Sequence, residues 1–303
     1  MARHPDRELP PLPPPFLPPG RVAVLPERGE IFYRHHEGGR PGEPTVVLLH
    51  GWTATADIQW FTAYEELGRR YPFVAVDHRG HGRGMRTEQR FTLEDAADDV
   101  AALCEHLGLR DVILVGYSMG GPIAMHVAHR HPGLAAGIVC IATAMEWRET
   151  VWDRAQWFAL FWLEIFLRSR MSRHGNRIGL RRLARGKPEV EPYVAWLAAE
   201  SRRGDPASLT EAGRALSAHD ARAWAPTIRI PATVVYTTHD QLVKTEKQAE
   251  LGAALDAEFL YPAGDHFVTV ARPQAFSEAT RRAVDGVVAR VSAARPARPT
   301  AVA

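Results

Sequence analysis

The sequence predicts an α/β fold, with a mostly parallel sheet and helices on both of its faces. Two observations carry this prediction. Short apolar runs alternate along the chain with stretches of helical spacing, and such runs are typical of strands that helices cover on both sides. The runs also end in polar residues. Because parallel strands share a carboxyl edge, these polar side chains are expected to gather where such sheets bind ligands.

Eight short segments are expected to form the strands. The first two are separated by proline and glycine, which favour a turn between them. The others are mostly apolar and are bounded by polar residues or glycine. The eight segments cover residues 21–25, 31–35, 45–49, 73–76, 112–115, 138–141, 233–236 and 259–261.

Four helices are expected between and after these strands. In residues 93–107, apolar residues such as Leu93, Ala97 and Val100 have the spacing of one helical face. The second helix begins at Pro122, since proline is tolerated in the first helical turn. The last three helices cover residues 122–131, 244–255 and 272–291.

The composition of the chain is that of an ordinary globular protein. Its 303 residues are 46% apolar and 24% charged, which excludes a collagen, a coiled coil and a largely disordered chain. The length suits one large domain or two modest ones. The formal net charge is +2. This charge gives no general attraction to nucleic acid, so no nucleic-acid partner is expected.

Cysteine content and the chain start predict the compartment. Cys104 and Cys140 are too few for a disulfide framework or a multi-cysteine zinc site. Both lie among apolar residues and are expected to be buried free thiols in a reducing compartment. The charged start lacks the pattern of a secretory signal, and the apolar run 157–167 is shorter than the roughly 20 residues that span a bilayer. We therefore expect a cytoplasmic chain without a transmembrane segment.

The chain divides into a core and three additions. Residues 1–20 contain eight prolines and are expected to form a polyproline-II arm, which is solvated or lies across the body or a partner. Residues 21–145 and 223–293 form the α/β core. Residues 146–222, the cap segment, lack strand alternation and are expected to form several helices above the strand ends. Residues 294–303 form a tail of small residues.

The cap segment differs in composition from the core, and holds five of the eight tryptophans. Residues 151–167 are apolar on nearly every helical face, so they are buried or line an apolar space. Residues 168–187 carry eight basic residues and no acidic one. One interpretation is a buried helix followed by a solvated basic helix. The others are an apolar acyl-chain pocket under the cap, and peripheral contact with lipid or another anionic surface.

The motif that indicates chemistry is Gly-Tyr-Ser-Met-Gly at residues 116–120, which fits the nucleophile elbow G-x-S-x-G. An apolar strand precedes it and a helix follows. The strand must reverse sharply into the helix with Ser118 at the apex, in a strained conformation. Side chains two residues before and after the serine would collide, so glycine occupies both positions. The alternative is a plain strand-to-helix turn with an inert serine.

With this motif, the sequence resembles the α/β-hydrolase superfamily, and in particular its serine-nucleophile, esterase- or lipase-like members. The resemblance covers residues 21–145 and 223–293. It implies an α/β-hydrolase fold with an inserted helical cap and no cofactor. Besides the elbow, the matching segments are His-Gly-Trp at 50–52, Asp-His-Arg-Gly-His-Gly at 77–82, Asp-Gln-Leu-Val at 240–243 and Gly-Asp-His-Phe at 264–267.

The resemblance implies a catalytic triad of Ser118, Asp240 and His266, in the chain order nucleophile, acid, base. A serine needs a base to take its proton, and imidazole can take and return a proton near neutral pH. The aspartate would hold the imidazole in the right tautomer. The backbone N–H groups of Trp52 and Met119 would form an oxyanion hole, worth roughly 3 kcal/mol per donor.

Other residues compete for these roles. Glu146 is the rival acid, because it follows the strand after the elbow helix. Asp265 is expected to have a turn or solvent role, and His239 to line a loop. His50 is expected to be a structural hydrogen-bonder rather than a base, and His78 and His81 to pack beside the pocket. His126, His129 and His131 crowd one helix, but no carboxylate or cysteine has matching spacing, so no metal is expected.

The expected function is that of a serine hydrolase acting on a carboxylic ester or lactone with an apolar acyl part. Enol-lactonase, thioesterase, C–C hydrolase and cofactor-free haloperoxidase or perhydrolase activities would use the same triad and remain alternatives. So does a non-catalytic ligand-binding or scaffold protein of the same fold. The oligomeric state is not predicted. The side chains expected to contact the substrate are His50, Tyr117, Trp147, Trp157, Phe161, Val243 and Phe267.

Overall fold

An eight-stranded sheet forms the centre of the computed structural model, which describes residues 11–148, 157 and 170–294. The strand order is β1-β2-β4-β3-β5-β6-β7-β8. The pairs β1–β2 and β2–β4 are antiparallel and the others are parallel, which confirms the predicted fold class. The strands are β1 Gly20–Leu25, β2 Gly29–His36, β3 Val46–Leu49, β4 Phe73–Val76, β5 Val112–Tyr117, β6 Ala135–Ile141, β7 Ala232–Val235 and β8 Glu258–Leu260.

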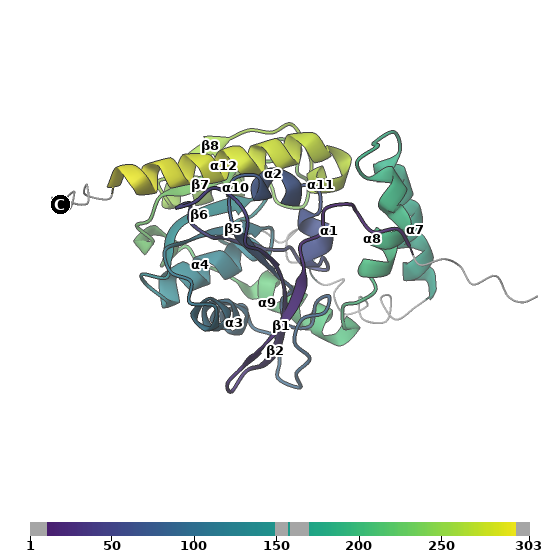
Figure 1. Cartoon of the computed structure of the whole chain (residues 1–303), viewed down its shortest axis with the longest axis horizontal. Coiled ribbons are helices and arrows are strands. Elements are labelled where there is room, and N and C mark those ends of the chain that lie inside the picture. The colour runs from purple at the N-terminus through teal and green to yellow at the C-terminus, as the bar shows by residue number, and fades with distance from the viewer. Residues whose placement is uncertain (1–10, 149–156, 158–169, 295–303) are drawn as a thin grey trace, which may run out of the picture.

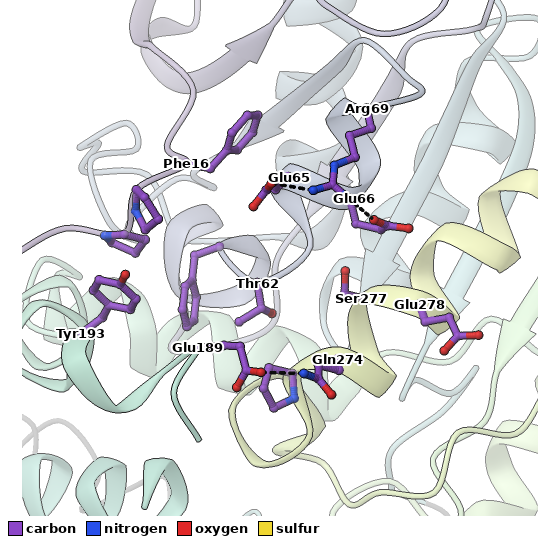
Figure 2. Close-up of a pocket in the computed structure, with 14 residues that line it drawn as sticks. Phe16, Thr62, Glu65, Glu66, Arg69, Glu189, Tyr193, Gln274, Ser277 and Glu278 are labelled. Carbon is purple, nitrogen blue, oxygen red and sulfur yellow. Dashed lines mark hydrogen bonds and ion pairs between the residues drawn. The ribbon is translucent and has the colours of Figure 1, made fainter. Parts of the chain in front are cut away.

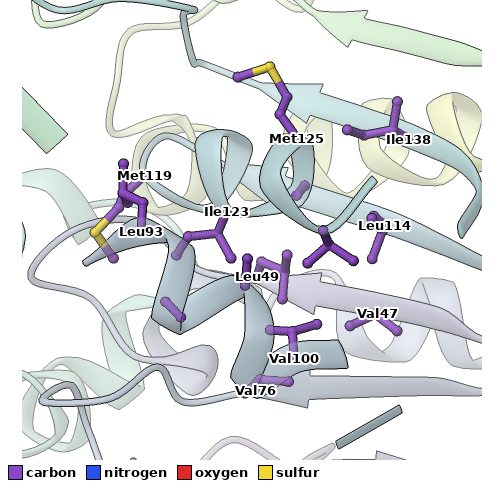
Figure 3. Packing of buried hydrophobic residues seen from close by; sticks show 14 of the residues in the cluster. Val47, Leu49, Val76, Leu93, Val100, Leu114, Met119, Ile123, Met125 and Ile138 are labelled. Atoms are coloured by element: carbon purple, nitrogen blue, oxygen red, sulfur yellow. The ribbon is translucent and has the colours of Figure 1, made fainter. Parts of the chain in front are cut away.

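Helices cover both faces of this sheet (Figure 1). β3 shows why a central strand is apolar throughout. Val47 and Leu49 lie in one hydrophobic cluster, and Val46 and Leu48 in a second cluster on the opposite face. Figure 3 shows the first cluster between the sheet, α3 and α4. One face packs against α3 Leu93–His106, α4 Gly120–Arg130 and α10 Thr245–Ala254, and the other against α1 Ala56–Trp60, α2 Tyr64–Gly68 and α12 Pro273–Ala294.

The four predicted helices correspond to α3, α4, α10 and α12, with ends that differ by a few residues. α1, α2 and the short helix α11, Val268–Ala271, were not predicted. Each of these has only four or five residues. That is less than two helical turns, which is too short for an apolar spacing to distinguish a helix from a loop.

The described part of the cap segment is helical. It contains α7 Arg170–Ala184, the 3-10 turn η1 Glu191–Tyr193, α8 Val194–Glu200 and α9 Pro206–Ala218. Asp205 caps α9, because its Oδ1 accepts the Ser208 N–H at 2.8 Å. Most of the apolar stretch 151–167, including Phe161, lies outside the described residues. Within the described ranges, no helix is both long and apolar enough to cross a membrane.

The described part of the Pro-rich arm lies against the body. Pro14 and Pro18 are buried, and the ring of Phe16 packs on that of His36 with centroids 5.6 Å apart. The arm, α2, α12 and the cap residues Glu189 and Tyr193 surround a cleft of about 570 Å³. Figure 2 shows this cleft with its paired glutamates and arginine on α2. Neither Ser118 nor His266 lines it, so it is separate from the site described next.

Candidate active site

Ser118 lies at the turn between β5 and α4, with φ of 49° in the left-handed region. The packing around this turn explains the two glycines of the motif. A Cβ on Gly116 would lie 2.2 Å from the carbonyl oxygen of Gly120, and a Cβ on Gly120 would lie 2.2 Å from that of Leu49. Both are backbone atoms that cannot move aside. The strand and helix therefore approach closely enough to present the serine at the apex only because these positions have no side chain.

His266 lies beside Ser118, between β8 and α11. Its Nε2 is 3.1 Å from Ser118 Oγ, a distance at which the serine hydroxyl donates to the imidazole. The hydroxyl of Tyr117 donates to the backbone oxygen of His266 at 2.8 Å. Tyr117, which precedes the serine in the elbow, thus anchors the loop that carries the histidine.

Asp240 completes a hydrogen-bonded line of three side chains. Its Oδ2 accepts from His266 Nδ1 at 2.8 Å and from the hydroxyl of Thr237 at 2.9 Å. Its Oδ1 accepts the backbone N–H groups of Leu242 and Val243, each at 2.9 Å. Burial alone would raise the pKa of this carboxyl, but the hydrogen bonds from His266, Val243 and Thr237 and the attraction of the imidazole hold it below its ordinary value. The carboxylate is therefore charged and fixed.

The rival acid Glu146 is engaged elsewhere. It forms a buried ion pair with Lys247 and accepts the N–H of Arg148 at 2.9 Å. Asp265 accepts the N–H of Phe267 at 2.9 Å in a turn, and His239 contacts Thr238 through Nδ1. Of the carboxylates considered in the sequence, Asp240 is the one that the structure places against His266.

The backbone N–H groups of Trp52 and Met119 stay the candidates for the oxyanion hole. Among the described residues, neither Trp52 nor Met119 donates its backbone N–H to a protein acceptor. The side chain of Met119 is fully buried in the cluster of Figure 3, so only its backbone can face the site. A Cβ on Gly51 would lie 3.2 Å from Ser118 Cβ. The loop thus passes close to the serine because it carries glycine there.

His50 holds this loop in place. Its Nε2 accepts the backbone N–H of His78 at 3.0 Å, so Nδ1 carries the proton and donates to the Gly51 oxygen at 2.8 Å. The rings of His78 and His81 lie 4.3 and 5.2 Å from that of His50. Burial and the neighbouring imidazoles lower the pKa of His50, and burial lowers the pKa values of His78 and His81 to about 3 and about 4. All three are neutral at pH 7.

A cavity of about 370 Å³ opens above Ser118. Of the side chains expected to contact substrate, Tyr117 and Phe267 line it. His50 is fully buried behind the loop, and Val243 packs in the core and supports Asp240 through its backbone, so neither side chain reaches the cavity. Trp147 and Trp157 are not among its lining residues. Their rings meet edge-to-face with centroids 6.3 Å apart, and Trp157 lies 5.6 Å from the ring of Trp52, which does line the cavity.

Sequence reasoning missed several residues that line this cavity. α7 contributes Gly175, Gly179, Leu180 and Leu183, and α8 contributes Leu197 and Ser201. From the core, Gln59 donates to the hydroxyl of Thr269 at 2.9 Å at the cavity wall. The apolar spacing of α7 and α8 could have indicated a buried face, but not which cavity that face lines.

The histidines of α4 do not gather around a metal position. The rings of His126 and His129 pack on Trp224, with centroids 4.8 and 4.7 Å away, and His131 contacts Asp98 at 2.8 Å. Within the described part of the chain, no group of three or more histidine, cysteine or acidic residues is arranged to hold a metal ion.

The fold and the elbow define the class of protein. A family-level sequence profile of the alpha/beta hydrolase fold matches residues 44–273, so the chain belongs to the α/β-hydrolase family. The pimeloyl-[acyl-carrier protein] methyl ester esterase of Chromobacterium violaceum is 30% identical over 242 residues, which make up 78% of this chain and 92% of that protein.

A second relative matches more closely over a shorter segment. The non-heme haloperoxidase of Rhodococcus erythropolis is 40% identical over 114 residues, or 37% of this chain and 40% of that protein. In this match, and in two others of similar length, the aligned part of the chain spans about two fifths of the relative's length.

Solved structures show the same fold. The enol-lactonase of Burkholderia xenovorans has a TM-score of 0.73 at 23% identity, covering 88% of this chain and 100% of that one. An esterase of Exiguobacterium antarcticum has a TM-score of 0.74 at 20% identity, covering 88% and 99%. These relatives are enzymes with different reactions, so the comparisons support an enzyme of the α/β-hydrolase type without selecting its substrate.

Proposed function

We propose that the chain is a serine hydrolase that cleaves a carboxylic ester or lactone with an apolar acyl part, through a covalent intermediate on Ser118. The observation that carries this proposal is the continuous hydrogen-bonded line Ser118 Oγ, His266 and Asp240, with distances of 3.1 and 2.8 Å. The esterase of Chromobacterium violaceum and the enol-lactonase fold neighbour are consistent with it.

The first half of the reaction forms the acyl-enzyme. His266 Nε2 takes the proton of Ser118 as Oγ attacks the carbonyl carbon. Asp240 stabilises the imidazolium that results. The N–H groups of Trp52 and Met119 bind the oxyanion of the tetrahedral intermediate. When the C–O bond of the ester breaks, His266 returns its proton to the departing alcohol oxygen.

The second half releases the acid. Water enters the cavity, His266 takes one of its protons, and the remaining hydroxide attacks the acyl carbon. Collapse of the second tetrahedral intermediate breaks the bond to Ser118, whose Oγ recovers the proton from His266. The chain contributes every group that this cycle needs, so the proposal requires no metal or cofactor.

Ser118→Ala tests the proposal against a matched control. Ser118→Ala should lower kcat on p-nitrophenyl esters by about 10⁴-fold or more and abolish labelling by a fluorophosphonate probe. Ser201→Ala changes another serine of the same cavity, whose hydroxyl donates to the Ala198 oxygen at 3.1 Å, and should leave labelling intact.

Two results would count against a serine hydrolase. Labelling that persists in Ser118→Ala would place the nucleophile elsewhere. A wild-type protein that neither reacts with the probe nor turns over esters, thioesters or lactones would favour a ligand-binding module. Turnover of thioesters, or of esters with hydrogen peroxide as acyl acceptor, in preference to ester hydrolysis would keep the triad and change the reaction.

A further inference from the structure

α7 presents two glycines to the cavity above Ser118. Gly175 and Gly179 are one turn apart on this 15-residue helix, and both line the cavity that Ser118 and His266 also line. Glycine in a helix interior destabilises the helix relative to alanine, because the unfolded chain loses more backbone freedom. Two such residues on one face therefore need a reason.

Neither backbone conformation nor packing supplies that reason. Both residues lie within α7 and neither has a φ in the left-handed region. Among the described residues, a Cβ built on either one meets no heavy atom within 4 Å beyond its chain neighbours and the backbone of its own helix. The elbow glycines differ, since a Cβ there would lie 2.2 Å from backbone atoms. Neither the backbone conformation nor a described neighbour therefore excludes an alanine at these two positions. What a side chain there would change is the amount of open space beside α7.

That space belongs to the substrate cavity. The next turn of α7 adds Leu180 and Leu183, and α8 adds Leu197 and Ser201, so the described wall around the two glycines is largely apolar. Gly175 is exposed and Gly179 is half-buried. Because both line a cavity of about 370 Å³ and a Cβ on either has open space among the described residues, we infer that a larger side chain there would take up part of that cavity. The two glycines therefore border a volume that faces the serine. Among the described cap residues that line it, the polar side chain is that of Ser201, whose hydroxyl is engaged by the Ala198 oxygen.

We propose that Gly175 and Gly179 set the length of the apolar chain that the site accepts, so that its substrates carry an extended aliphatic group which runs beneath α7. This inference rests on the proposed hydrolase function. It concerns selection among substrates rather than the chemical step, because the triad side chains are held by bonds to one another and to core residues.

The test replaces each glycine by a leucine and measures kcat/KM on p-nitrophenyl acetate, butyrate and octanoate, and on the acetates of ethanol and octanol. For Gly175→Leu and Gly179→Leu, we expect octanoate or octyl acetate turnover to fall by about tenfold or more. Turnover of p-nitrophenyl acetate should stay within about threefold of the wild type, since a short acyl group does not reach the filled volume.

Two control variants separate filled space from damage to the helix. Arg181→Leu adds a leucine at an exposed position of α7 that does not line the cavity, and it should leave the chain-length profile unchanged. Gly179→Ala adds one methyl group. It should raise Tm through helix propensity while it shortens the chain-length profile less than Gly179→Leu does.

Binding of octanoate, measured by calorimetry, gives a readout that needs no turnover. The proposal expects the wild type to bind octanoate and Gly179→Leu to bind it about tenfold more weakly. Equal chain-length profiles and equal octanoate affinities in the wild type and both leucine variants would overturn it, as would equal losses on acetate and octanoate. If the hydrolase proposal alone fails, ester turnover is absent in the wild type but the octanoate comparison still decides the role of the glycines.

Discussion

The two sides of the cavity hold their side chains in different ways. On the core side, Ser118, His266 and Asp240 are fixed by hydrogen bonds, and the carboxylate of Asp240 accepts four of them. On the cap side, the wall consists largely of leucine side chains and of glycines that add none. A hydrogen-bonded group must keep its position to act, whereas an apolar wall needs only the right shape. From this difference we expect the core to determine the reaction and the cap to determine which substrates reach it.

The two sides are nevertheless joined by buried polar contacts. Arg83, in the turn after β4, donates to Glu200 of α8 at 2.8 Å, and Glu200 is 2% exposed. The indole N–H of Trp52 donates to the Leu209 oxygen of α9 at 2.6 Å. Because Trp52 also supplies a proposed oxyanion donor, the position of α9 is coupled to the geometry of the oxyanion loop.

The largest effect on the core side is expected from Asp240→Asn. An amide can neither hold the correct imidazole tautomer nor stabilise its charged form, so kcat should fall by roughly 10⁴-fold. The fall should be the same for p-nitrophenyl acetate and octanoate, because the core acts on the bond that breaks. Steady-state kinetics on both esters check this.

Glu146→Gln is the matched control, since it neutralises the rival carboxylate. It should leave kcat within a fewfold of the wild type, although it removes the ion pair with Lys247 and should lower Tm. A near-normal kcat for Asp240→Asn combined with a severe loss for Glu146→Gln would transfer the acid role to Glu146. If the loss of kcat in Asp240→Asn instead depends on the length of the acyl chain, the core also takes part in substrate selection, and the proposed division of roles between core and cap is wrong.

A smaller effect is expected from Thr237→Val. The Thr237 hydroxyl donates to Asp240 Oδ2 at 2.9 Å and accepts from Gln248 Nε2 at 3.0 Å. Loss of one hydrogen bond to a buried carboxylate should lower kcat by about tenfold with little change in KM, and it should shift the pH dependence of kcat. Thr238→Val, at the neighbouring threonine that contacts His239, should change neither. If Thr237→Val has the same kcat and the same pH dependence of kcat as Thr238→Val and the wild type, Thr237 does not position the acid.

The sequence was informative where steric demands are local. The elbow glycines follow from a requirement that acts within five residues, and the structure has both in contact with backbone oxygens. The central strands β3 and β4 were equally accessible, because both are fully buried and leave no polar position in their patterns. Ser118, Asp240 and His266 were named from the resemblance, and the structure places their side chains within hydrogen-bonding distance of one another.

The sequence was uninformative where a side chain's role depends on the path of a distant loop. Val243 was expected to contact substrate, yet its backbone N–H caps Asp240 and its side chain is buried. Thr237 and Gln248 support the same carboxylate from positions three residues before and eight residues after it. The α7 glycines had no visible reason in the sequence, because their surroundings come from a separate part of the chain. Each of these contacts requires the tertiary structure.

The smallest expected effect is on the pH dependence of stability, and it compares buried histidines with an exposed one. In the folded state, burial lowers the pKa values of His78 and His81 to about 3 and about 4, whereas an unfolded chain protonates both near pH 6.5. The unfolded state therefore binds more protons below pH 6.5, so the stabilisation is complete above that pH and is lost as the pH falls toward 4. The slope is on the order of 1.4 kcal/mol per pH unit for each buried histidine.

His78→Phe should make the fall of Tm between pH 6.5 and pH 4 shallower, because it removes one group that must stay neutral to remain buried. The Nε2 atom of His78 has no hydrogen-bond partner among the described residues, so the substitution loses no bond at that atom. His106→Phe, at an exposed position of α3, should leave the slope unchanged. Equal slopes for the wild type and His78→Phe would mean that the buried histidines do not limit acid stability.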